Sequence, residues 1–306
     1  MVFDDRCHRN SVPALDVHGN PRIMNPLVLA SRRPVAVIAR ALALLFLVSF
    51  LFFPVYWMMV TALKPNQQIF VQFPEFIPTH PVLDNFKRAI SQSNLPTYLV
   101  NSMITAGGSS LLTTTLAALA AYGFAKYRFS GRFATMNIMI GAQMFPFAVI
   151  LISLYPMMQS AGLLDTLTGL TIAYVVFALP PAIYILFSFY SRLPNELIEA
   201  ARIDGASEIA ILRRIVLPLS KPALISVAVY SFTWAWNDLL YSLTLVTSDN
   251  LRTIGPGLLL TFFGEMQQDW GGAMAAAILA SLPAVIIFAF LQRFFVAGLT
   301  SGAVKS

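Results

Sequence analysis

Four residues of one apolar stretch have the spacing of a ligand-binding helix face. Trp234, Asn237, Asp238 and Tyr241 recur at i, i+3, i+4 and i+7, which places them on one side of a helix. Aromatic rings can stack on the apolar face of a pyranose, while amide and carboxylate groups bond its hydroxyls. These residues are candidates to line a path for a polyhydroxylated solute, and Gln143 is a weaker candidate.

Asp238 is the one ionisable residue well inside a predicted membrane-spanning segment. A carboxylate there costs about 2.5 to 3.5 kcal/mol, so it should face water or a partner group instead of lipid. Besides contacting solute, Asp238 could pair across a subunit interface or brace its own helix. All three roles stay open on the sequence.

Residues suited to catalysis or metal binding are scarce. Cys7 is the only cysteine, and His8, His18 and His80 are the only histidines, so no disulfide framework or zinc-type cluster can be assembled. The chain also lacks the G-x-x-x-x-G-K-[ST] phosphate loop, so any ATP must be hydrolysed in another polypeptide. We expect a non-catalytic chain that binds no metal or cofactor itself.

The composition indicates a membrane protein. Hydrophobic residues make up 57% of the 306 residues and charged residues only 11%, against roughly 25% charged residues in soluble domains. A helix needs about twenty uncharged residues to cross the bilayer. Six segments qualify: 41–60, 99–121, 133–157, 168–190, 222–246 and 271–292. The expected fold is an all-α integral membrane protein with six transmembrane helices, kinked where a proline such as Pro146 removes a backbone donor.

Basic residues predict the orientation of these six segments. Sixteen of the 20 Lys and Arg residues precede the first segment, follow the last, or lie in the second and fourth connections. Only Lys64, Lys87, Arg88 and Arg252 fall on the other side. By the positive-inside rule, both termini should be cytoplasmic.

The connection 193–218 has the pattern of two short helices that meet at a bend. Leu193, Leu197 and Ala200 recur at helical spacing, Gly205 can end that helix in a left-handed conformation, and Ser207 can cap a second helix. An amphipathic helix on the lipid headgroups is the competing interpretation.

Glu199-Ala200-Ala201, with Gly205 and then Leu217-Pro218 at fixed offsets, resembles the cytoplasmic "EAA" loop of binding-protein-dependent ABC importer permeases. The resemblance implies the type I permease fold, a place in the bacterial cytoplasmic (inner) membrane, and a coupling helix that docks on a separate ATPase dimer, which uses ATP and Mg. The implied ATPase-coupling residues are Glu199, Ala200, Ala201, Asp204, Gly205, Leu217 and Pro218.

Two further stretches, 234–240 and the tail 298–305, are similar to the carbohydrate branch of that family, as in the smaller permease of maltose-type importers. This resemblance implies a second homologous permease subunit and an extracytoplasmic solute-binding protein, which Glu265 and Asp269 could contact. The solute would be a sugar or related polyol, with disaccharide, oligosaccharide, polyol and glycerol phosphate all open. No nucleic-acid partner is expected, because the basic residues fall in the gaps between apolar segments.

The expected organisation is therefore as follows: a cytoplasmic N-terminal tail, 1–35; a first transmembrane helix, 36–61; an extracytoplasmic segment, 62–98; a permease core, 99–293, with the coupling loop 193–218; and a cytoplasmic C-terminal tail, 294–306. The main alternative is an ion-gradient-driven secondary transporter or channel subunit. Such a protein normally shows paired intramembrane charges or inverted repeats, and this sequence shows one acid and no convincing repeat.

Overall fold

The computed structural model describes residues 34–264 and 269–303, with side chains over 37–264 and 269–290. Regular structure in these ranges is entirely helical, which confirms the predicted all-α class. The principal helices are α2 (Pro34–Ala62), α3 (Asp84–Ser91), α4 (Leu95–Lys126), α5 (Arg132–Gly141), α6 (Phe147–Ser160), α7 (Leu167–Tyr190), α8 (Asn195–Ile203), α9 (Glu208–Ile211), α10 (Leu217–Leu219), α11 (Lys221–Trp236), α12 (Leu240–Leu245), α13 (Ile254–Phe262) and α14 (Trp270–Ala303). Short helical segments are η1 (Asn66–Gln68), η2 (Ala142–Met144), η3 (Leu212–Val216) and η4 (Asp249–Leu251).

The chain divides into two compact units, Met1–Tyr56 and Trp57–Ser306. The described part of the first unit is the N-terminal portion of α2, in which every side chain over 37–56 is exposed and most are apolar. A helix that is apolar on all sides is suited to lipid rather than to water.

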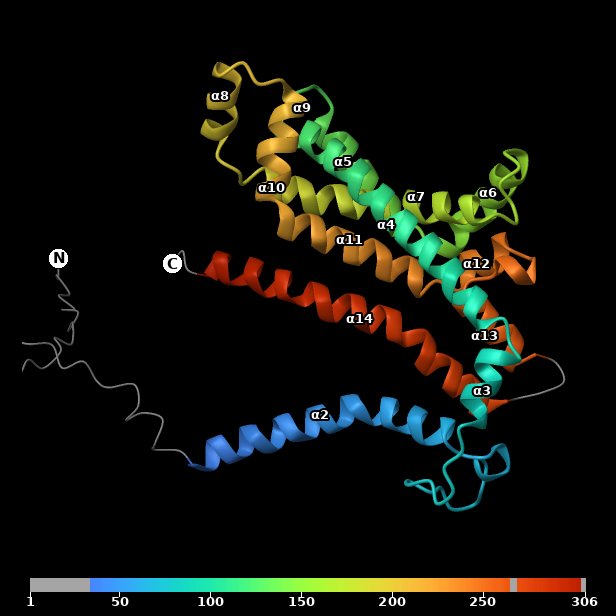
Figure 1. Ribbon diagram of the computed structural model, residues 1–306. Helices are drawn as coiled ribbons and strands as arrows, with labels where there is room; N and C mark the ends of the chain where they lie inside the picture. The colour runs from blue at the N-terminus through green and yellow to red at the C-terminus, as the bar shows by residue number, and fades with distance from the viewer. Residues whose placement is uncertain (1–33, 265–268, 304–306) are drawn as a thin grey trace, which may run out of the picture. The chain divides into compact units, whose positions relative to one another are not determined.

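The second unit is built around three helices, α4, α7 and α11, which pack side by side (Figure 1). Small residues allow the close approach: Ala117 and Ala121 of α4 and Ala182 of α7 have no exposed surface. Because lipid supplies no hydrophobic drive between helices, such close packing is what holds a membrane bundle together.

Within the described ranges, four helices are long and apolar enough to cross a membrane, or up to six if each of two bent pairs counts as one span. The bent pairs are Arg132–Met144 with Phe147–Ser160, at 101°, and Glu208–Leu219 with Lys221–Trp236, at 81°. The first break falls at Pro146, whose extended backbone precedes α6, as the missing proline donor predicts.

The fifth predicted segment, 222–246, differs from the expectation. Its continuous helix α11 ends at Trp236, and the separate helix α12 starts at Leu240. The physical reason lies in the polar pair Asn237-Asp238, because short polar side chains offer backbone groups hydrogen bonds that compete with helix continuation.

Candidate functional site

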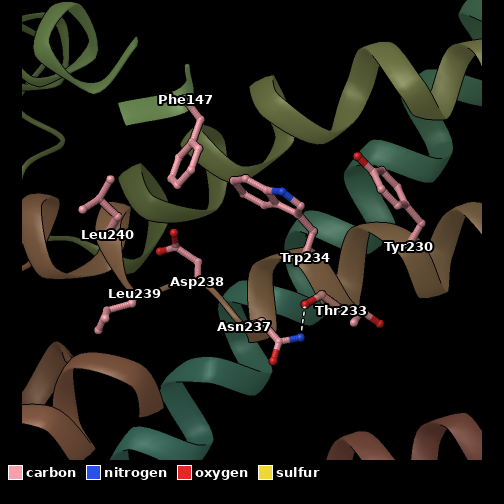
Figure 2. A pocket seen from close by; sticks show the side chains of 8 residues that line it. All are labelled: Phe147, Tyr230, Thr233, Trp234, Asn237, Asp238, Leu239 and Leu240. Atoms are coloured by element: carbon pink, nitrogen blue, oxygen red, sulfur yellow. Dashed lines mark hydrogen bonds between the residues drawn. The ribbon is translucent and has the colours of Figure 1, made fainter. Parts of the chain in front are cut away.

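A cavity of about 710 Å³ opens where α11 ends. Figure 2 shows its lining: Phe147, Tyr230, Thr233, Trp234, Asn237, Asp238, Leu239 and Leu240. Three of the five sequence candidates, Trp234, Asn237 and Asp238, are among these residues. The cavity therefore lies at the helix break, and not along one face of a continuous helix as predicted.

Asp238 braces this break. Its Oδ2 accepts hydrogen bonds from the Tyr174 hydroxyl of α7 and from the Ser242 amide, both at 2.9 Å, and its Oδ1 accepts one from the Tyr241 amide at 3.3 Å. The two amides belong to the first turn of α12, whose backbone donors have no intrahelical acceptor. Of the three roles left open by the sequence, these contacts correspond to the structural one, in which Asp238 braces its own helical segment.

Trp234 forms an aromatic wall of the cavity. Its ring stacks on Phe177 of α7, with centroids 4.7 Å apart and planes within 16°, and meets Tyr174 edge-on at 5.8 Å. Such pairs fix the ring plane and so prepare a flat apolar surface.

Asn237, also exposed at the cavity, donates from Nδ2 to the Thr233 carbonyl at 2.8 Å (Figure 2). Its Oδ1 accepts no hydrogen bond within the described part of the chain, which leaves an acceptor available to a hydroxyl.

The other two candidates lie outside the lining. Tyr241 is buried, with its hydroxyl donating to the Phe147 carbonyl at 3.1 Å and its ring stacked on Phe147. Gln143 is exposed on η2 and donates to the Phe177 carbonyl at 3.2 Å. Both side chains support neighbours of the cavity.

Sequence reasoning missed several lining residues, some of which carried a detectable signal. Tyr230, Thr233, Trp234 and Asn237 are also spaced i, i+3, i+4 and i+7, one turn earlier than the predicted set, and all four line the cavity. Phe147 comes from α6 beyond a helix break, and no local pattern connects it to α11.

The loop 193–218 folds as the sequence predicts at its bend. Gly205 has φ +79°, and a pair of hydrogen bonds closes α8: Gly205 N–H to the Arg202 carbonyl and Ala206 N–H to the Ala201 carbonyl, both 3.0 Å. This pair is the Schellman arrangement that a left-handed residue after the helix permits. The Ser207 hydroxyl accepts from the Ala210 amide and so caps α9, as predicted.

The outer side of this bend is exposed. Glu199 and Ala200 of α8 face outward, while the neighbouring Ile198 is only 3% exposed. Two large apolar side chains on either side of the bend, Ile203 and Ile209, are 86% and 78% exposed. An apolar surface of this kind, beside charges, is typical of a docking site.

The coupling candidates divide into an exposed set and a partly buried set. Asp204, Gly205 and Pro218 are exposed, whereas Ala201 and Leu217 are half-buried and pack on the core cluster of α4 and α7. An ion pair within the loop, Arg202 Nε to Glu208 Oε1 at 2.6 Å, joins α8 to α9 across the bend.

Asp165, in the loop between α6 and α7, is held by hydrogen bonds. Asp165 Oδ1 accepts from the Thr247 and Ser248 amides at 2.9 Å, and its Oδ2 accepts from the Ser248 hydroxyl. The Ser248 hydroxyl in particular holds the pKa of Asp165 below its usual range, because these donors favour the ionised form. This carboxylate fixes the segment that follows α12.

Asp269, a candidate contact for a binding protein, lies just before α14, and its carboxylate is engaged in contacts within the chain. It accepts from Asn66 Nδ2 at 2.8 Å and from the Gly272 amide at 2.9 Å, and pairs with Arg88 at 3.4 Å. The other candidate, Glu265, lies outside the described residues.

The family model for "Binding-protein-dependent transport system inner membrane component" matches residues 113–301, which include both the cavity and the loop 193–218. The chain belongs to this family. It is the membrane permease component of a binding-protein-dependent importer, as the EAA resemblance predicts, and the alternative of a gradient-driven transporter is not supported.

Several permeases are similar to this one over most of its length. The diacetylchitobiose uptake system permease protein DasC of Streptomyces coelicolor is 37% identical, over 83% of this chain and 92% of that protein. The trehalose/maltose transport system permease protein MalG of Thermococcus litoralis is 36% identical, over 83% and 91%.

A solved structure shows the same fold. A chain of a bacterial ABC transporter that imports the acidic polysaccharide alginate superposes with a TM-score of 0.77 at 19% identity, over 87% of this permease and 98% of that chain.

Proposed function

We propose that this permease forms half of the translocation path for a neutral sugar or related polyol. The observation that carries the proposal is the cavity at the α11 break, in which an oriented indole, a free amide oxygen and a tyrosine line the wall. No Lys or Arg is among its eight described lining residues, so an anionic solute would find no counter-charge. The names of the relatives support a carbohydrate.

ATP, with Mg, is used in this proposal by a separate ATPase dimer that docks on the loop 193–218. Glu199, Ala200, Asp204 and Gly205 would contact it, while Leu217 and Pro218 lead the chain back into the bundle. Exposed Ile203 and Ile209 beside these polar residues support a contact with another protein. The fixed bend at Gly205 supports it too, because a helix that only lies on the membrane surface does not need one.

The assembly would also contain a second homologous permease and an extracytoplasmic solute-binding protein. A solved alginate transporter of the same fold is in complex with a pentasaccharide-bound periplasmic protein. In this arrangement the loop 193–218 and both termini are cytoplasmic, and the segment 62–98 is extracytoplasmic.

Transport by proteoliposomes tests the solute class. The permease would be reconstituted with its partner ATPase, second permease and binding protein, and offered neutral disaccharides, a polyol and an oligouronate. We expect uptake of a neutral solute, reduced several-fold by Asn237→Ala and little changed by Gln143→Ala, because Gln143 does not line the cavity. Uptake of the oligouronate alone would contradict the proposal.

A further inference from the structure

A second cavity, of about 280 Å³, lies between the end of α2 and the start of α14. Its lining is Trp57, Thr61, Lys64, Ile69, Phe70, Trp270 and Met274. All of these residues belong to the second unit of the chain. The cavity is remote in sequence from the residues around Trp234, and nothing in the proposed transport path uses it.

Lys64 brings a buried positive charge to this cavity. Its side chain is only 3% exposed, and its Nζ donates to the Glu75 carbonyl and lies 5.4 Å from the centroid of the Trp57 ring. Among the described residues no carboxylate pairs with it. A carbonyl and an aromatic face stabilise an ammonium only partly, so within the described ranges the charge of Lys64 has no counter-ion.

Trp270 contributes its ring to the same cavity. The ring meets Phe70 and Phe263 edge-on, with centroids 5.9 and 4.9 Å apart, so its plane is fixed. Its indole Nε1 is buried and does not face the cavity. A negatively charged group in the cavity would therefore pair with Lys64, between the aromatic walls of Trp57 and Trp270.

The cavity walls are held in place by two asparagines. Buried Asn85 donates to the carbonyls of Ala62 and Lys64, both at 2.8 Å, and so fixes the chain where α2 ends. Asn66 bonds Asp269 and accepts from the Gly271 amide at 3.3 Å, which ties the next residues to α14. The cavity is therefore preorganised by the fold.

The position of the cavity in the chain indicates which kind of anion it could bind. Trp57 and Thr61 lie in the last turns of one candidate span, Val37–Ala62, and Trp270 and Met274 in the first turns of another, Trp270–Phe290. The ends of spans lie at the level of the lipid headgroups, where tryptophan is enriched. The apolar walls around Lys64 favour an amphiphile over a small hydrated ion.

We propose that this cavity binds the phosphate-bearing headgroup of an anionic phospholipid. The phosphate oxygens would accept from Lys64 Nζ, and the glycerol and first acyl carbons would contact the apolar lining, which is Trp57, Phe70, Trp270 and Met274. The bound lipid would fasten the ends of α2 and α14 to each other at the membrane surface.

Native mass spectrometry of the purified importer complex tests the proposal. The probes are phosphatidylglycerol, diacylglycerol with the same tails but no phosphate, and inorganic phosphate. We expect selective retention of phosphatidylglycerol, weakened about tenfold by Lys64→Gln, which removes a charge-assisted bond, and several-fold by Trp270→Ala, which removes an apolar wall of the cavity. Lys87→Gln is the matched control, because that lysine is 77% exposed on α3 and should leave lipid retention unchanged.

Three results would overturn the proposal. In the first, Lys64→Gln retains the lipid as the parent does. In the second, Lys87→Gln weakens retention equally, which would mean a diffuse surface charge. In the third, inorganic phosphate binds as well as the lipid, which would mean a free-anion site. If Lys64→Gln does not assemble, Trp270→Ala decides, and full retention of the lipid by that variant would also overturn the proposal.

Discussion

Asp238 shows how a single carboxylate can have a structural role inside a membrane protein. Its three acceptor bonds go to one tyrosine and to two amides that the break between α11 and α12 leaves free. A buried acceptor that replaces missing helix bonds stabilises the break itself, and the cavity depends on that break for its shape. In the proposed path, Asp238 would therefore affect solute contact indirectly, through the break beside which Trp234 and Asn237 lie.

We predict that Asp238→Ala lowers uptake and thermal stability of the complex together. Leaving the Tyr174 hydroxyl and two amides unpaired should cost about 3 kcal/mol or more, since each buried unsatisfied group costs about 1 to 3 kcal/mol. Tyr174→Phe, which removes one bond, should show a smaller loss of both. Differential scanning fluorimetry beside uptake checks this. Lost uptake at unchanged melting temperature would instead identify Asp238 as a solute contact.

Among the elements, the bend of the loop 193–218 depends on one backbone conformation. Gly205 has φ +79°, and a Cβ built there meets nothing within 4 Å. Any penalty for a side chain at this position is therefore conformational, and not steric crowding by neighbours.

We predict that Gly205→Val weakens ATPase docking while Gly205→Asn is tolerated. A β-branched residue is unfavourable at this φ by about 1 kcal/mol or more, whereas asparagine adopts the left-handed region more readily. Co-purification of the ATPase and uptake should fall together for the valine variant. If that variant retains its ATPase and transports at the parental rate, the loop is not the coupling element.

Two glycines allow a paired test of helix packing. A Cβ at Gly257 of α13 would lie 2.2 Å from Cδ2 of buried Tyr98, while a Cβ at Gly107 of α4 meets nothing within 4 Å. We predict that Gly257→Ala destabilises the protein by about 1 to 3 kcal/mol through overpacking. Gly107→Ala should be neutral or stabilising by up to about 1 kcal/mol, as alanine favours a helix over glycine. Equal melting temperatures for the two variants would contradict this.

For the whole chain, the sequence predicted the helical class, the membrane character and the bend at Gly205, because each depends on composition or local spacing. It did not predict that Asn237 ends α11, because apolar residues continue to Val246 and hydropathy alone cannot distinguish a continuous span from a broken one. Contacts such as Tyr174 to Asp238 join helices far apart in the chain, and no local pattern encodes them.

Orientation in the membrane can be tested by labelling introduced cysteines. Cys7 is the only native cysteine, so single-cysteine variants can be made in a Cys7→Ser background. We predict that an impermeant maleimide labels Gln72→Cys in intact cells and Ser130→Cys only after permeabilisation, since basic residues collect around the latter. Labelling of the Ser130 variant in intact cells would reverse the topology.

One consequence follows from α11 being bounded by a bend at each end. The helix has 16 residues, so it is a stiff rod of about 24 Å, with the 81° bend at its start and the Asp238 break at its end. A tilt of α11 imposed near Ser220 would therefore displace Trp234, at the other end of the helix, while the helix itself stays straight. We expect Ala228→Gly, in the middle of α11, to make the helix more flexible and to lower the number of solutes moved per ATP hydrolysed. An unchanged ratio would mean that α11 does not transmit the movement.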